Sequence, residues 1–138
     1  MSALDVLRAA YSAWSDEDVP ALLDLIADDV VFAVNVPLNL RSYVGKGIGK
    51  HHFETGLRRL LAEWEVVEYT PLWFKQYGLW QRVHVAYCYR ERRTGLEIES
   101  TMRHHWRVVG DEIVQLEVHF DGPRMDAFRR LVQAEARV

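Results

Sequence analysis

The chain has 138 residues, of which 49% are hydrophobic and 27% charged, and its formal net charge is −3. This length and balance are typical of one folded domain with a hydrophobic core, spanning residues 1–138, and they exclude a disordered or fibrous chain. The negative net charge argues against nucleic acid as a partner, because phosphate binding requires a clustered basic excess.

The first third of the sequence predicts two helices and a strand. One apolar helical face is formed by residues at i, i+3, i+4 and i+7, namely Leu7, Ala10, Tyr11 and Trp14. A second short helix is expected near Pro20, with apolar residues Leu22, Leu23, Leu25 and Ile26. The β-branched run at residues 30–34 then predicts a strand.

An irregular loop with three glycines is expected over residues 35–49, followed by a third helix from about Lys50 to Glu63. The apolar residues of this helix recur at helical spacing, and they are Phe53, Leu57, Leu60, Leu61 and Trp64. In this loop Arg41 and Tyr43 are candidates to close over a pocket, although an ordinary surface loop is the favoured interpretation.

The second half of the chain predicts four successive strands and a last helix. The strands are expected at residues 66–77, 79–92, 97–109 and 113–120. Thr94-Gly95 and Gly110-Asp111 are typical of tight turns, which join antiparallel strands. Asp121 and Pro123 are typical of a helix start, so a final helix is expected through about Ala134. The fold class is therefore α+β: a curved antiparallel sheet packed on three helices from the N-terminal half, with a short C-terminal helix.

This order of elements and several short motifs resemble the SnoaL-like branch of the nuclear-transport-factor-2-like (NTF2-like) superfamily, which also contains ketosteroid isomerase and limonene epoxide hydrolase. The matching motifs are spread over nearly the whole chain, and they are Ala13-Trp14, Leu25-Ile26-Ala27-Asp28-Asp29-Val30, Gly45-Lys46-Gly47, His105-Trp106-Arg107, Gly110-Asp111-Glu112-Ile113-Val114 and Phe120-Asp121. The resemblance implies a cone-shaped fold with a deep apolar pocket, usually in a dimer. It does not fix the function, because the family includes isomerases, cyclases, hydrolases and non-catalytic binding modules.

The alternation of residues along the predicted strands separates a pocket face from an outer face. Met102, His104 and Trp106 share one face of their strand, and the charged residues around them share the other. Val118 and Phe120 lie on the corresponding face of the last strand. Because burying a row of charges is costly, the face with Trp106 is expected to line the pocket. His104 is then a polar residue on an apolar wall, suited either to acid–base chemistry near pH 7 or to a structural hydrogen bond.

The family resemblance supports only part of a known catalytic site. In ketosteroid isomerase the position of His104 carries an acid that donates a hydrogen bond to an oxyanion, and in SnoaL-type cyclases it carries a histidine. The base of the isomerase would fall at Val34 or Asn35, and its tyrosine donor at Ala10, next to Tyr11. The cyclase aspartate would fall near Val118, and the Asp-Arg-Asp arrangement of the epoxide hydrolase has no counterpart on the pocket face. A direct copy of any of these mechanisms is therefore not expected.

The candidate site combines these residues. The catalytic candidates are His104, with Tyr11 or Asn35 as a hydrogen-bond partner; turn formation is the alternative role for Asn35. The ligand-binding candidates are the aromatic and apolar residues of the expected inward faces: Trp14, Phe32, Phe53, Tyr87, Tyr89, Met102, Trp106, Val118 and Phe120. For these aromatic residues, core packing is the alternative.

No cofactor or metal is expected. The glycines of Gly45-Lys46-Gly47-Ile48-Gly49-Lys50 are too closely spaced for a P-loop, and His51 follows where Ser or Thr would stand. His104 and His105 point to opposite faces of a strand and do not bind one ion easily, and no acidic residue joins them at an established spacing. The single cysteine, Cys88, allows no internal disulfide. No secretory signal or membrane span is recognisable, so a cytoplasmic location and no membrane partner are expected.

Three functions follow as hypotheses. The first is an enzyme that isomerises, cyclises or hydrates a small, largely apolar molecule by cofactor-free acid–base chemistry. The second is a binding module that holds such a molecule without turning it over. The third is an interaction protein that uses the sheet face. The outer face carries both signs of charge on neighbouring strands, which is typical of solvated ion pairs and also compatible with a homodimer interface.

Overall fold

The computed structural model describes residues 1–35 and 46–136. The first helix, α1 (Ala3–Ser15), begins with a capping box, in which Ser2 and Asp5 exchange side-chain to backbone hydrogen bonds. The predicted apolar face of α1 is buried. Helix α2 (Val19–Leu23) begins at Asp18, whose side chain accepts a hydrogen bond from the backbone of Ala21, and Pro20 lies in its first turn as predicted.

The remaining helices also lie close to their predicted positions. Helix α3 (Lys50–Glu63) has the bounds that the sequence indicates. Helix α4 (Gly122–Ala136) begins after Asp121, whose carboxylate accepts from the backbone of Arg124, and it continues two residues beyond the predicted end. With 15 residues α4 is not shorter than α1 or α3.

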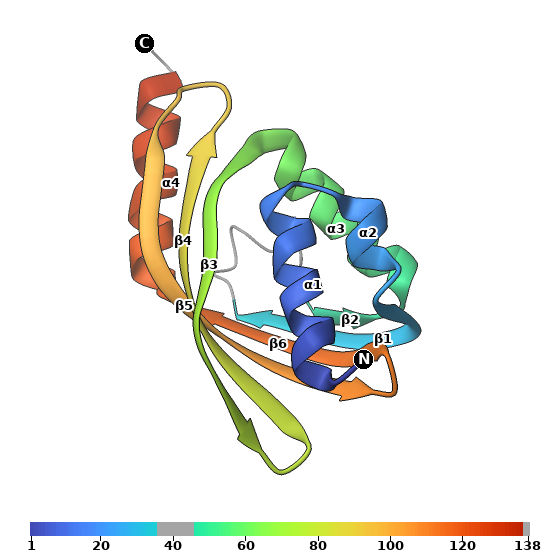
Figure 1. Cartoon of the computed structure of the whole chain (residues 1–138). Coiled ribbons are helices and arrows are strands. Elements are labelled where there is room, and N and C mark those ends of the chain that lie inside the picture. Colours follow the sequence, from blue (N-terminus) through green and yellow to red (C-terminus); the bar gives the residue numbers. More distant parts are fainter. Residues whose placement is uncertain (36–45, 137–138) are drawn as a thin grey trace.

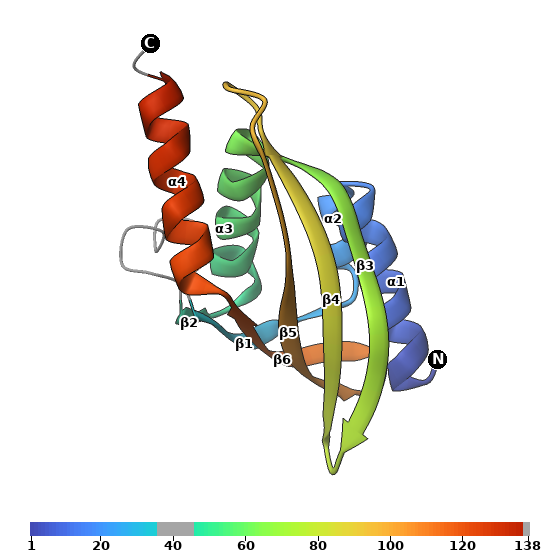
Figure 2. The same cartoon turned by 90° about the vertical axis from the view of Figure 1, so that its left-hand side faces the viewer.

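One six-stranded sheet forms the framework, with the order β2-β1-β6-β5-β4-β3. Its strands are β1 (Ile26–Asn35), β2 (Lys46–Ile48), β3 (Trp64–Tyr77), β4 (Trp80–Glu91), β5 (Glu97–Val109) and β6 (Glu112–Phe120). Figure 1 shows α1, α2 and α3 together on one side of the curved sheet, and α4 apart from them beside β4 and β5. In Figure 2 the long strands β3, β4 and β5 run steeply across the direction of β1 and β6, so the sheet is strongly bent.

The sheet is antiparallel except at one junction, where β1 and β6 run parallel. The prediction of an antiparallel sheet is therefore correct for every strand pair but this one. The short strand β2, which pairs with β1, replaces the end of the loop expected at residues 35–49. The candidate loop residues Arg41 and Tyr43 lie outside the described residues.

Two apolar residues were assigned to helices and belong to strands. Ile26 begins β1, where the backbone N–H of Ile113 donates to the carbonyl of Leu25. Trp64 begins β3 and is in register with Glu91. Both side chains continue the helical spacing of the segment before them, but strand pairing with a distant segment determines their backbone conformation.

The hydrophobic core lies between the concave face of the sheet and α1, α2 and α3. Val83 and Val85 of β4 and Ile113 of β6 are completely buried in it. Helix α4 adds Met125, Phe128 and Val132, and the rings of Phe128 and Trp64 have centroids 5.4 Å apart. Sheet and helices therefore enclose one apolar interior, and the candidate site lies within it.

Candidate functional site

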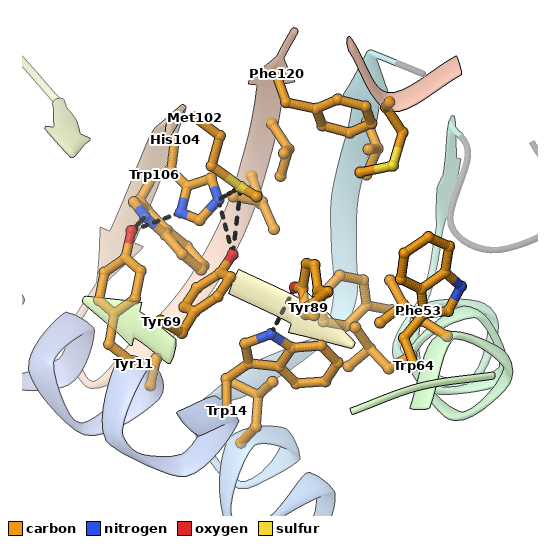
Figure 3. Close-up of a pocket in the computed structure, with 18 residues that line it drawn as sticks. Tyr11, Trp14, Phe53, Trp64, Tyr69, Tyr89, Met102, His104, Trp106 and Phe120 are labelled. Carbon is orange, nitrogen blue, oxygen red and sulfur yellow. Dashed lines mark hydrogen bonds between the residues drawn. The ribbon is translucent and has the colours of Figure 1, made fainter. Parts of the chain in front are cut away.

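An apolar cavity of about 140 Å³ opens inside this core. Figure 3 shows that it is surrounded by side chains from the helices and from the concave face of the sheet. Nine of its lining residues were singled out from the sequence, and they are Tyr11, Trp14, Phe53, Tyr89, Met102, His104, Trp106, Val118 and Phe120. The strand alternation thus identified the cavity wall on β5 and β6.

Two of the expected contacts do not line the cavity. Phe32 is 1% exposed and packs behind the wall, with its ring 5.2 Å from that of Phe53 and 5.1 Å from that of His52. Tyr87 is buried on the inward face of β4, and its ring contacts Tyr89, which does line the cavity. The alternative interpretation, core packing, holds for both. Asn35 is the last residue of β1, and its side chain lies outside the described part of the chain.

The other half of the wall was not among the candidate site residues, although most of its members were predicted to be apolar positions of helices or strands. These residues are Ala10, Leu22, Val34, Leu57, Leu60, Trp64, Tyr69, Leu116 and Met125. Most of them add aliphatic surface. Tyr69 matters more, because its hydroxyl group joins the polar network around His104.

His104 is the centre of that network. It is 2% exposed, and its two ring nitrogens face two different tyrosines. Nδ1 lies 2.6 Å from the hydroxyl oxygen of Tyr11, and Nε2 lies 3.1 Å from that of Tyr69 and 3.0 Å from Sδ of Met102. The indole N–H of Trp106 donates to the Tyr11 hydroxyl over 2.9 Å. Figure 3 shows these side chains together at one end of the cavity.

The direction of these hydrogen bonds follows from counting donors and acceptors. The indole N–H of Trp106 can only donate, so the Tyr11 oxygen accepts from it and has its own proton to give. The acceptor within reach of that proton is Nδ1 of His104, so the imidazole proton is on Nε2 and is donated to Tyr69 or Met102. The hydroxyl proton of Tyr69 is then left with Sδ of Met102 at 3.5 Å, a weak acceptor, and with the hydroxyl of Tyr89, which already accepts from Trp14. Tyr69 is therefore the group best placed to donate to a ligand.

The electrostatics of the site keep it neutral. Burial lowers the pKa of His104 to about 3, and the nearby His105 and His119 contribute to the shift. Burial also raises the pKa of Tyr11, Tyr69 and Tyr89 well above the ordinary value. The imidazole is thus uncharged near pH 7, and its ionisation lies far from the neutral range that the sequence-based hypothesis assumed.

A further hydrogen bond from Trp14 ties α1 to the sheet. The indole N–H of Trp14 donates to the hydroxyl of Tyr89 over 3.1 Å. The centroids of the Tyr69 and Tyr89 rings are 6.1 Å apart, so the two hydrogen-bonded groups share an aromatic wall. The polar atoms of these lining residues therefore bond to one another, and the cavity presents mainly apolar surface.

The lining residues are poorly suited to a metal ion or a phosphate group. Among those in the described part of the chain, His104 is accompanied by no carboxylate and no cysteine. Of the glycines near this point that the structure describes, Gly47 lies in strand β2, and Gly49 precedes α3 with a φ of 105°. In addition, no helix among the described residues is long and apolar enough to cross a membrane.

The comparisons with known proteins identify the fold. No family model and no curated protein matches the sequence. Among solved structures, an NTF2-like protein of unknown function from Burkholderia pseudomallei aligns with a TM-score of 0.74 at 23% identity, covering 94% of this chain and 97% of that one. A protein from Catenulispora acidiphila with a ketosteroid isomerase-like fold, in complex with trimethylamine, aligns with a TM-score of 0.70 at 19% identity, covering 84% and 85%.

TerC, co-crystallised with polyporic acid, aligns with a TM-score of 0.77 at 19% identity over 94% of this chain and 97% of its own. SnoaL-like proteins are also among the matches. The chain therefore has the NTF2-like, ketosteroid isomerase-like fold that the sequence motifs predicted. At such low identity the likeness establishes the fold and leaves the activity open.

Proposed function

We propose that this NTF2-like chain binds one small, largely apolar organic molecule in the cavity beside His104. The observation that carries this proposal is an apolar cavity of about 140 Å³, partly open to solvent, between the concave face of the sheet and the helices. Native cores contain few voids larger than a water molecule, because the atoms that border a void lack packing partners on one side, which costs stability. A ligand in the cavity would supply those partners.

The size of the cavity limits the ligand. An apolar cavity of roughly 150 Å³ in a protein core binds benzene, so this one suits a single aromatic or alicyclic ring. The hydroxyl of Tyr69 offers one hydrogen bond at the polar end, which favours a ring that carries a carbonyl or hydroxyl group. The trimethylamine and polyporic acid bound to proteins of this fold differ greatly, so the fold itself does not select among ligands.

Filling the cavity is expected to abolish binding. In Ala10→Phe the new ring enters the cavity from α1, whereas Ala9→Phe adds the same ring one residue away, outside the cavity lining. We expect toluene and 2-cyclohexenone to stabilise the wild type and Ala9→Phe against heat, since a ligand that binds only the folded state raises the melting temperature. For Ala10→Phe the affinity should fall at least tenfold.

Tyr69→Phe tests the polar end in the same titrations, with Tyr87→Phe as a buried control off the cavity wall. Affinity for 2-cyclohexenone should fall several-fold in Tyr69→Phe and that for toluene should not. Trimethylammonium belongs in the panel as a cation, because aromatic walls also attract cations. A wild type that neither toluene nor 2-cyclohexenone stabilises would contradict the proposal, as would unchanged binding to Ala10→Phe.

A second candidate function is catalysis by the same network, and the contacts of His104 with two phenols favour it. In that case Tyr69 donates a hydrogen bond to a ligand carbonyl, and the Nε2–H of neutral His104 donates to the Tyr69 oxygen, in a chain of hydrogen bonds that continues to Tyr11 and stabilises negative charge developing on the ligand oxygen. Catalysis by this chain of hydrogen bonds needs no cofactor and suits isomerisation, cyclisation or hydration. Turnover of enolisable ketones and epoxides should then be lost in His104→Ala and kept in His84→Ala, a histidine of the outer face. Equal turnover in all three proteins, or none in any, removes this candidate.

The homodimer through the outer sheet face and the cytoplasmic location stay predictions. On that face Arg90 pairs with Glu65 at 3.1 Å and with Glu97 at 2.8 Å within one chain, and Trp73 stacks on His84. Trp73 is 43% exposed, and a second copy of the face would cover it. Sedimentation velocity tests this directly: the expected mass is twice 16.1 kDa, and a monomer at micromolar concentration would contradict it.

A further inference from the structure

The outer face of the sheet brings together three side chains that the cavity does not use. His105 of β5 is in register with Glu117 of β6, and His119 lies two residues further along the same face of β6. The sequence interpretation rejected His104 and His105 as a metal pair because they point to opposite faces, and the structure agrees. The register between β5 and β6 supplies the partners of His105 instead.

The spacing of these three side chains is close to that of metal ligands. Nδ1 of His105 lies 3.7 Å from Oε2 of Glu117, and Nε2 of His119 lies 3.6 Å from the same oxygen. All three ligand atoms lie within 4.8 Å of one another. Ligands of a tetrahedral zinc ion with bonds of about 2.1 Å are ~3.4 Å apart. Two of the three separations therefore nearly fit, and the third is at most 4.8 Å.

The surroundings allow an ion to enter but also limit its affinity. The three side chains are between 33% and 39% exposed, so the site is open to solvent. Arg82 and Arg103 are the register neighbours of His105 and His119, and their positive charges oppose a bound cation. Arg82 extends toward Tyr77, with its guanidinium carbon 5.9 Å from the ring centroid. Glu117 supplies a negative charge among the ligands.

The chemistry of the donors selects the class of metal. Two imidazoles and one carboxylate suit Zn²⁺, Ni²⁺ or Cu²⁺, whereas Mg²⁺ and Ca²⁺ prefer oxygen ligands alone. Three protein ligands leave at least one position for water. Nε2 of His105 is buried and has no hydrogen-bond partner in the described part of the chain. No hydrogen bond orients the ring through this nitrogen, which lowers the expected affinity.

We propose that His105, Glu117 and His119 form a binding site for a divalent transition-metal ion of the zinc class on the outer face of the sheet. The ion joins β5 to β6 within one chain, with water completing its coordination. This site is separate from the cavity, because His104 and His105 project from opposite faces of β5. It does not depend on the proposed ligand-binding function.

Calorimetric titration with zinc chloride tests this site, using tag-free protein stripped with a chelator. One zinc ion per chain is expected. Glu117→Gln and His119→Ala should each lower the affinity at least tenfold, and His84→Ala should leave it unchanged. His84 is the matched control, because it is a histidine on the same face with an aromatic neighbour, Trp73, and it is not part of the cluster.

Cobalt substitution gives a second readout that depends on geometry. Visible absorption of bound Co²⁺ should be present in the wild type and in His84→Ala, and lost in His119→Ala. The metal-free forms of all variants should have melting temperatures within a few degrees of one another, since these side chains are half-exposed. Zinc binding that survives in Glu117→Gln and His119→Ala overturns the proposal, and so does a stoichiometry of one zinc ion per two chains.

Discussion

The wild type should lose stability steeply as the pH falls below 6.5, and His104→Gln should lose much less. In the unfolded chain this histidine binds a proton near its ordinary pKa of about 6.5. In the folded protein burial lowers the pKa to about 3, with further contributions from His105 and His119. Between these two values the unfolded state binds one more proton than the folded state. The free energy of unfolding is therefore greatest above pH 6.5 and decreases as the pH is lowered.

The expected size of this effect is large. The slope is about 1.4 kcal/mol per pH unit for one proton, so the wild type should lose on the order of 4 kcal/mol between pH 6.5 and pH 3 relative to the variant. Urea unfolding at a series of pH values measures it. Carboxylates titrate in the same range, but they are present in both proteins and cancel in the difference. A difference between wild type and His104→Gln that stays constant with pH would show that His104 is not buried as described.

Removing the hydroxyl of Tyr11 should be far more costly than removing that of Tyr87. In Tyr11→Phe the indole N–H of Trp106 and Nδ1 of His104 both lose their partner inside the core. Each buried polar group left without a hydrogen bond costs roughly 1–3 kcal/mol, so a loss of about 3 kcal/mol is expected. The volume of the side chain hardly changes, and a cavity effect is small.

Tyr87→Phe provides the matched control for this prediction. Tyr87 is also a buried tyrosine of the sheet, but its hydroxyl, which lies near the side chain of Ser100 on β5, makes no hydrogen bond of good geometry in the described part of the chain. Its removal should change the free energy of unfolding by less than about 1 kcal/mol. Denaturant unfolding with unchanged m-values measures both variants. Equal losses in the two variants would mean that Tyr11 does not hold the network together.

Local patterns in the sequence predicted most of the fold, because they depend on neighbouring residues. The apolar face of α1, the bounds of α3 and the inward face of β5 all follow from simple periodicity. The strand β2 was missed, because three residues around Gly47 carry no alternation. The parallel pairing of β1 with β6 is a long-range choice that no local pattern encodes.

In the candidate site too, local patterns predicted some residues, and features that depend on long-range structure were missed. His104, Met102 and Trp106 were placed correctly by alternation along an uninterrupted stretch of β5. Tyr69 was missed, because no inward face was assigned to the strand at residues 66–77, and the register of β3 against β4 shifts there between Val66 and Glu68. Two adjacent apolar residues, Val66 and Val67, of which only the first is buried, are the signal that could have indicated this irregularity. The depressed pKa of His104 could not be predicted either, since it depends on complete burial.

The position of β1 between β2 and β6 has a consequence for biosynthesis. As the chain leaves the ribosome, β1 emerges early, yet its long partner β6 follows only after α3 and strands β3–β5. Until then β1 can pair only with the three residues of β2. Contacts between such distant segments make folding slow, because the intervening chain must be ordered first. We therefore expect the nascent chain to stay incompletely folded, and open to proteases or chaperones, until β6 has been synthesised.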